Sequence, residues 1–167
     1  PLHTQRRRQR QMCIRDSNRH DVLRSHFEFG VASNSRIISA PITQESLSHY
    51  FEVVDAKSEN KTSLAQRVRR DAQIPFSLDN GPLVHIKLYQ LEDEAVLAMT
   101  CHHIISDLSS LLIVFEEFFQ LYSQAFADNE IALPAPGSNY QTFTLWQQEW
   151  LNTDPVSYTH LRAHETV

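Results

Sequence analysis

The chain has 167 residues, of which 41% are hydrophobic and 21% are charged, with 15 Lys and Arg against 20 Asp and Glu. This length and apolar fraction are enough for one domain with a buried core, which argues against intrinsic disorder. No apolar run approaches the roughly 18 residues that a membrane-spanning helix needs.

The two ends of the chain differ in character from its middle. Residues 7–16 read back in one frame as about ten codons that resemble a transposase-type adapter used to prepare DNA libraries, and residues 156–165 read back as the reverse complement of its other arm. We therefore expect residues 1–17 and 155–167 to be adapter-derived tails, and residues 18–154 to be the natural sequence. A nucleic-acid-binding arm and a transit peptide are the alternatives for the Arg-rich and Gln-rich start.

Residues 18–154 are acidic and nearly free of cysteine. They hold 9 Lys and Arg against 18 Asp and Glu, a net charge of −9. A surface with no basic stripe does not suit nucleic-acid phosphates. Cys101 is the only cysteine in this range, which excludes a disulfide framework, a multi-thiolate zinc site and an iron–sulfur cluster within it.

The first half of this range predicts short strands and one helix. Residues 19–24 mix polar and apolar side chains at helical spacing, which indicates the last turns of a helix. Strands are expected at residues 27–31, 36–39 and 50–54, with the first two joined in a hairpin. Ser63 is expected to cap a helix over residues 64–73.

The second half predicts a hairpin and two further helices. Residues 83–91 and 95–103 are expected to form antiparallel strands, because only a short acidic turn joins them. Ser106 or Asp107 suits the start of a long helix with apolar residues at three- and four-residue spacing, and a last helix is expected over 140–151. The whole pattern predicts an α/β (α+β) fold, with helices covering a mixed, largely antiparallel sheet.

Two adjacent histidines, His102 and His103, stand where the second of these strands should end. Neighbouring strand residues point to opposite faces, so the two imidazoles are not expected to share one site or one metal ion. One imidazole should pack within the domain and the other should face a cleft, while Asp107 either caps the helix or pairs with a cation. On spacing alone, a purely structural role for all three residues stays open.

Four segments, taken in chain order, resemble the motifs of the condensation domains of nonribosomal peptide synthetases. Residues 19–27 resemble Arg-His-Glu-x-Leu-Arg-Thr-x-Phe, and residues 75–83 resemble Pro-Phe-Asp-Leu followed by Gly-Pro-Leu. Residues 102–107 resemble His-His-x-x-x-Asp-Gly, and residues 139–147 resemble Tyr-x-Asp-Phe-x-x-Trp. Each motif is weak to moderate alone, but their shared order over nearly the whole of residues 18–154 is specific.

The resemblance implies a chloramphenicol-acetyltransferase-like fold, of which residues 18–154 would form a partial N-terminal lobe that is inactive alone. In this family the active site lies in a tunnel between two lobes. It forms an amide between a donor thioester and an aminoacyl acceptor. Both arrive on the phosphopantetheine arms of carrier domains, so no cofactor is expected to bind directly. The implied partners are donor and acceptor carrier domains, an adenylation domain and the C-terminal lobe, in the cytoplasm, with no nucleic acid, membrane or metal.

The resemblance also implies roles for individual residues. His103 matches the catalytic histidine, which accepts a proton from the acceptor amine or positions it, and His102 matches the structural histidine. Asp107 matches an aspartate that pairs with the first arginine of the upstream motif, here Arg19. Arg24 and Trp146 match supporting positions.

Two residues depart from the family's pattern. Leu108 stands where glycine is usual, which would narrow the tunnel, indicate a different donor or accompany a loss of activity. Thr142 stands where aspartate is usual.

Other functions on the same fold stay open. An epimerization domain, a free-standing acyltransferase and a non-catalytic recruitment domain are the alternatives. Heterocyclization is disfavoured, because those domains carry paired aspartates in place of the histidines.

Overall fold

The described residues fall into two compact units. The structure is a computed structural model that describes residues 14–15, 17–31, 33–126 and 133–153. One unit comprises residues 1–134 and the other residues 135–167. The two expected tails lie almost wholly outside the described residues, so their adapter origin stays a prediction.

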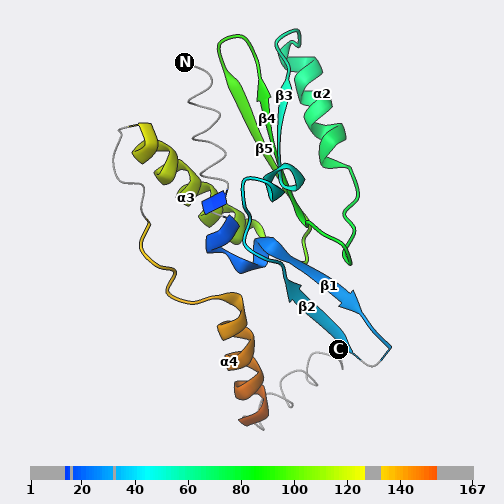
Figure 1. The fold of residues 1–167 in the computed structure, drawn as a ribbon, viewed down its shortest axis with the longest axis vertical. Helices are drawn as coiled ribbons and strands as arrows, with labels where there is room; N and C mark the ends of the chain where they lie inside the picture. Colours follow the sequence, from blue (N-terminus) through cyan, green and yellow to red (C-terminus); the bar gives the residue numbers. More distant parts are fainter. Residues whose placement is uncertain (1–13, 16, 32, 127–132, 154–167) are drawn as a thin grey trace, which may run out of the picture. The chain divides into compact units, whose positions relative to one another are not determined.

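The first unit opens with a small two-stranded sheet. Residues 17–19 are helical and lead into a short 3-10 helix, η1 (Asp21–Arg24). Strand β1 (Ser25–Phe29) then pairs antiparallel with β2 (Asn34–Ile38), as Figure 1 shows. This confirms the predicted hairpin, whose turn is closed by a hydrogen bond from Gly30 N to Ser33 O of 3.1 Å.

A second sheet of three strands forms the centre of this unit. After a 3-10 helix, η2 (Ser46–His49), come β3 (Phe51–Asp55), β4 (Val84–Gln90) and β5 (Ala95–Cys101), in the spatial order β3-β4-β5. Strands β4 and β5 are antiparallel, as their short connection requires. Strands β3 and β4 are parallel, because helix α2 (Lys61–Ala72) carries the chain back between them.

Side chains alternate along the central strand, so the sheet has two different faces. Val84, Ile86 and Leu88 of β4 join the larger core, which also contains buried residues of helix α3 (Leu108–Phe126). Tyr89 points the other way and packs with Leu64 of α2. Helices α3 and α2 therefore cover opposite faces of one sheet.

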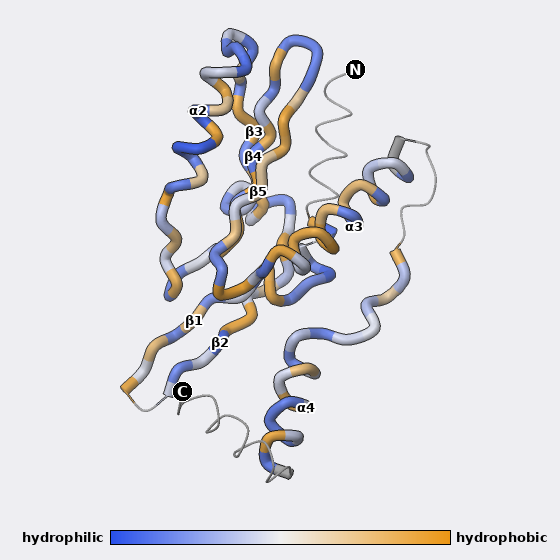
Figure 2. Tube along the Cα trace, turned by 180° about the vertical axis from the view of Figure 1, so that it is seen from behind, coloured by the Kyte–Doolittle hydropathy of each residue, from blue (hydrophilic) through white to orange (hydrophobic). Residues whose placement is uncertain are grey.

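The two covering helices differ in how much apolar surface they leave exposed. Figure 2 shows long hydrophobic stretches along α3, whereas much of α2 is hydrophilic. One side of α3 is buried through Val114, Phe118 and Leu121. Other large apolar side chains of α3 are exposed, namely Leu108, Leu112, Ile113 and Phe119.

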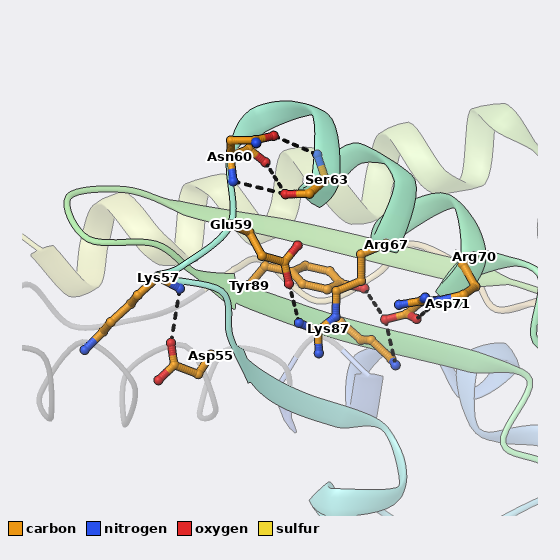
Figure 3. Close-up of polar contacts among 10 residues, drawn as sticks. All are labelled: Asp55, Lys57, Glu59, Asn60, Ser63, Arg67, Arg70, Asp71, Lys87 and Tyr89. Atoms are coloured by element: carbon orange, nitrogen blue, oxygen red, sulfur yellow. Dashed lines mark hydrogen bonds and ion pairs between the residues drawn. The ribbon is translucent and has the colours of Figure 1, made fainter.

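Helix α2 begins earlier than predicted. Asn60 is its N-cap, and the Asn60 side chain accepts hydrogen bonds from the backbone N–H groups of Thr62 (3.0 Å) and Ser63 (2.9 Å). Ser63 Oγ in turn accepts from Asn60 N at 3.0 Å, which completes a reciprocal capping box (Figure 3). The prediction that Ser63 is the cap was wrong, because Ser63 occupies the third helical position of this motif.

A carboxylate at the end of α2 anchors this helix to the sheet. Asp71 accepts a hydrogen bond of 2.8 Å from the Tyr89 hydroxyl and one of 3.3 Å from Lys87 Nζ (Figure 3). Burial and the neighbouring Asp71 both raise the pKa of Tyr89. Burial opposes ionisation of Asp71, but the hydrogen bonds from Tyr89 and Lys87 outweigh it and the net pKa of Asp71 is lowered.

The second unit contains helix α4 (Tyr140–Thr153), close to the predicted range. The backbone N–H of Thr142 and its hydroxyl both donate to Asn139 Oδ1, at 2.8 Å and 2.9 Å, so Asn139 caps the helix. Aromatic rings follow each other along α4 from Tyr140 through Phe143 and Trp146 to Trp150. All four side chains are exposed within this unit.

Two general features concern the described residues alone. None of their helices is both long enough and apolar enough to span a bilayer. No group of three or more His, Cys, Asp or Glu among them is arranged to hold a metal ion.

The capping box predicts a local loss of stability. Replacement Asn60→Ala leaves two helix N–H groups without their acceptor, so the free energy of unfolding should fall by about 1 kcal/mol in urea titrations at 25 °C. Ser58→Ala, in the exposed loop before the helix, is the control and should change the value by less than about 0.5 kcal/mol. Equal effects of the two substitutions would show that the cap does not stabilise α2.

Candidate active site

The histidine pair lies in the turn between strand β5 and helix α3. Strand β5 ends at Cys101, so residues 102–107 form the connection. His102 N donates to Leu83 O at 2.9 Å, and Ile105 N donates to His102 O at 3.1 Å. Ile105 is buried in the larger core, which holds the middle of the turn against the sheet.

The approach of the preceding loop to this turn depends on a glycine. Gly81 has a φ of +56°, a conformation that favours glycine. Pro82 and Leu83 follow it in the chain. Leu83 has no exposed surface, and its carbonyl receives the N–H of His102. The Gly-Pro-Leu segment therefore supplies the carbonyl group that accepts the backbone hydrogen bond from the first residue of the turn.

His103 is exposed, and its ring orientation is set by one hydrogen bond. Its Nδ1 lies 2.7 Å from the carbonyl oxygen of Ser106. A carbonyl oxygen can only accept, so this partner assigns the proton of the neutral ring to Nδ1. Nε2 then carries a lone pair on an exposed ring, which is the form that can accept a proton.

His102 is half-buried and has the opposite hydrogen-bonding arrangement. Its Nδ1 accepts a hydrogen bond of 3.1 Å from Ile104 N, which assigns the proton of the neutral ring to Nε2. The two rings thus differ in burial and in tautomer. Strand alternation was expected to separate them, but β5 ends at Cys101, two residues before the predicted end at residue 103, so the separation arises within the turn.

Asp107 caps helix α3. Its Oδ1 accepts hydrogen bonds from Ser110 N at 2.7 Å and from Ser110 Oγ at 2.6 Å. The hydrogen bonds from Ser110 hold the pKa of Asp107 below its ordinary value, and the nearby His103 adds a smaller effect in the same direction. Asp107 therefore fixes the start of the helix that follows the histidine turn.

The expected pair between Asp107 and Arg19 is wrong for this structure. Arg19 Nε lies 3.0 Å from both carboxylate oxygens of Glu117, and His20 Nε2 lies 2.7 Å from Glu117 Oε2. The physical reason is that the Asp107 carboxylate serves the N–H groups of its own helix, while Glu117 faces the segment that carries Arg19.

Sequence reasoning missed Glu117, although a signal was present. Glu117 falls between Val114, Phe118 and Leu121 on the buried side of α3, where a carboxylate needs a partner. Burial raises the pKa of Glu117, but hydrogen bonds from His20 and Arg19 more than offset it, so the net pKa is lowered. The cluster of Arg19, His20 and Glu117 therefore ties residues 17–24 to α3.

The other residues singled out from the sequence, Arg24, Leu108 and Trp146, lie in three different places. Arg24 donates from Nε to Ser17 O at 3.3 Å and from Nη1 to Ser39 O, so it joins Ser17 to the residue that follows β2. Leu108 is the first residue of α3, with 73% of its surface exposed. Trp146 lies on α4, where its ring is 5.9 Å from that of Phe143.

The chain is similar in sequence to a known family of proteins. Residues 16–158 match the model of the condensation domain family. The chain belongs to the condensation domain family. Malpinin synthetase of Mortierella alpina is 34% identical over 141 residues, and gramicidin S synthase 2 of Brevibacillus brevis is 32% identical over 139 residues. These alignments cover 83% of this chain but only 2% and 3% of the two relatives.

Solved structures with a similar fold agree with the fold expected for this chain. The epimerization domain from the third module of tyrocidine synthetase B has a TM-score of 0.72 and 27% identity, covering 92% of this chain and 37% of that one. The first condensation domain of the CDA synthetase has a TM-score of 0.74 at 16% identity, covering 90% and 36%. The predicted fold class and family are confirmed, and the chain spans little more than a third of these solved chains.

The Glu117 cluster predicts stability that depends on pH. Because the folded state lowers the pKa of Glu117, its contribution is present above the unfolded pKa of about 4.3 and is lost as the pH falls through the folded value. Glu117→Gln should therefore lower the free energy of unfolding by about 2 kcal/mol near pH 7, and the difference should vanish at the acid end of a urea series.

The control for this prediction is the neighbouring Glu116→Gln, which makes the same change of net charge at an exposed position. It should alter stability by less than about 0.5 kcal/mol at every pH. A Glu117→Gln effect that did not depend on pH would contradict the assigned ion pairs.

Proposed function

We propose that residues 18–154 form part of the N-terminal lobe of a nonribosomal peptide synthetase condensation domain that makes amide bonds. The exposed His103 ring carries this proposal. Its Nδ1–H is held by the Ser106 carbonyl at 2.7 Å, which leaves the Nε2 lone pair free. A neutral, oriented imidazole is the group best suited to accept a proton near neutral pH.

The reaction needs one proton acceptor and one leaving thiolate. The acceptor's amine nitrogen attacks the carbonyl carbon of the donor thioester, and a C–N bond forms. The C–S bond then breaks and the sulfur leaves as a thiolate. Nε2 of His103 takes the proton that the amine loses, and this proton can pass to the thiolate to give a free thiol. His103 acts here as the base, or holds the amine in position for attack.

The other residues near the turn hold His103 and need not touch substrate. His102 accepts from Ile104 N, and Asp107 caps α3, so the turn is fixed at both of its ends. Arg19, Arg24 and Trp146 would support the lobe through packing and hydrogen bonds. Without the second lobe the chain should have no condensation activity.

The partners follow from this reaction. Donor and acceptor would each arrive as a thioester on the phosphopantetheine arm of a carrier domain, with an adenylation domain nearby to load the acceptor. No further cofactor is needed, since thioester aminolysis is a polar reaction with no electron transfer. We place the parent enzyme in the cytoplasm.

Epimerization is the second candidate, because the tyrocidine synthetase structure with 27% identity is an epimerization domain. The same Nε2 would then remove the α-proton of a carrier-bound residue, a proton would return to the opposite face of the α-carbon, and no new amide would form. Product analysis separates the two functions, since condensation lengthens the chain on the acceptor carrier and epimerization leaves its length unchanged.

The decisive experiment uses a complete domain with the second lobe restored. Loaded with aminoacyl donor and acceptor carriers, it should form a dipeptidyl thioester, and His103→Ala should slow this at least about 100-fold. The matched control is His49→Ala, which removes another exposed imidazole of the same unit. An alanine variant at position 103 that matches the parent rate would overturn the role of His103.

Leu108 provides a separate prediction about activity. Leu108 is 73% exposed, and it takes no part in the hydrogen bonds of the His102 and His103 rings described above. Leu108→Gly should therefore leave kcat/KM for dipeptide formation within about threefold of the parent, a difference of less than 1 kcal/mol in the barrier. A gain of tenfold or more would show that the Leu108 side chain narrows the active-site tunnel.

A further inference from the structure

Phe76 bridges two histidines that lie far apart in the sequence. It belongs to the Pro-Phe-Ser-Leu segment between α2 and β4, which the proposed reaction does not use. The centre of its ring is 4.9 Å from that of His85, with an angle of 39° between the planes. It is also 6.1 Å from the ring of His102, at 86°, in an edge-to-face arrangement.

Strand register explains why these three rings meet. His85 of β4 is the Cα partner of Thr100 of β5, and side chains two residues apart share a face. His85 and Thr100 therefore face the α2 side of the sheet, and His102 lies just beyond the end of β5, where its N–H is bonded to Leu83 O next to β4. Helix α2 covers this face near Tyr89 and Leu64, whereas Phe76 lies at the end where the histidines are.

The distances between the ring centroids are short enough for Phe76 to orient both histidine rings. Both centroid separations fall in the range of about 4.5–7 Å in which aromatic pairs attract each other. All three side chains are half-buried, so neither histidine ring turns freely in solvent. Burial lowers the pKa of His85, which favours the neutral form of the ring that packs against Phe76.

The His102 ring connects Phe76 to the turn formed by residues 102–107 through a hydrogen bond. Its Nδ1 accepts from Ile104 N at 3.1 Å, so the angle of the His102 ring determines whether that N–H keeps its partner. His103 lies between these two residues in the chain. Its own hydrogen bond to Ser106 O closes the same turn.

We infer that Phe76 is a positioning residue, which holds the ring of His102 and through it the turn that orients His103. This rests on the proposed function only for its catalytic consequence. The structural consequence, an ordered turn, can be measured on the 167-residue chain itself.

The first test is carried out on this chain by NMR. The unsubstituted chain should show a nuclear Overhauser effect between the Phe76 and His102 rings. In Phe76→Leu the amides of Ile104 and Ile105 should exchange with solvent at least tenfold faster relative to that of Ser110, and Phe76→Tyr, which keeps the ring, should restore them. Phe119→Leu is the control, since it makes the same change at an exposed position of α3.

Two results would overturn the inference. One is the absence of the ring-to-ring effect in the unsubstituted chain, a measurement that does not depend on whether any variant folds. The other is exchange at Ile104 and Ile105 that rises no more than at Ser110 in Phe76→Leu, which would mean that Phe76 contributes general packing alone.

The second test uses the complete domain. Phe76→Leu should lower kcat about tenfold or more with KM nearly unchanged, because a small displacement of a catalytic group slows the chemical step without removing binding contacts. An unchanged kcat with a disordered turn would refute the catalytic role of His103 and leave the positioning contact standing. An unchanged kcat with an ordered turn would overturn the positioning role itself.

Discussion

The backbone hydrogen bond from His102 N to Leu83 O is the interaction on which the rest of the site depends. It follows directly on the last paired residues of β4 and β5, where Val84 lies opposite Cys101. Beyond this bond the chain leaves the sheet, and within residues 102–107 it must turn and begin α3. His102 and His103 differ in burial and in tautomer because His102 lies directly at the end of β5, whereas His103 lies one residue further into the turn.

Helix α3, which follows this turn, is capped at its start and tied to another segment further along. Asp107 satisfies the N–H of Ser110 at the start of the helix, and Glu117 accepts from Arg19 and His20 further along. Charge-assisted bonds of this kind are about twice as strong as neutral ones. The Asp107 cap is internal to α3 and stabilises its first turn, whereas the Glu117 bonds tie the helix to Arg19 and His20. Together they hold the helix that follows the histidine turn.

Much of the fold could be predicted from the sequence, because the decisive signals are local. Turn residues around Gly30 and the acidic turn after β4 defined two hairpins, and apolar spacing defined α3. The start of α2 was missed because Asn60 and Ser63 are both good capping residues, and the sequence does not say which of them is the N-cap. The partner of Arg19 was missed because the family resemblance assigned Asp107, and no local pattern in the sequence identifies Glu117, 98 positions away, as the partner.

The tautomer of His103 is the property that the proposed chemistry requires, and imidazole 15N NMR measures it directly. In the 167-residue chain, at a pH where the ring is neutral, long-range 1H–15N correlations should give Nδ1 as the protonated nitrogen and Nε2 as the unprotonated one. That result would agree with the hydrogen bond to Ser106 O. A spectrum with the proton on Nε2, or with the two forms in rapid exchange, would contradict the arrangement in which the turn holds His103 ready to accept a proton.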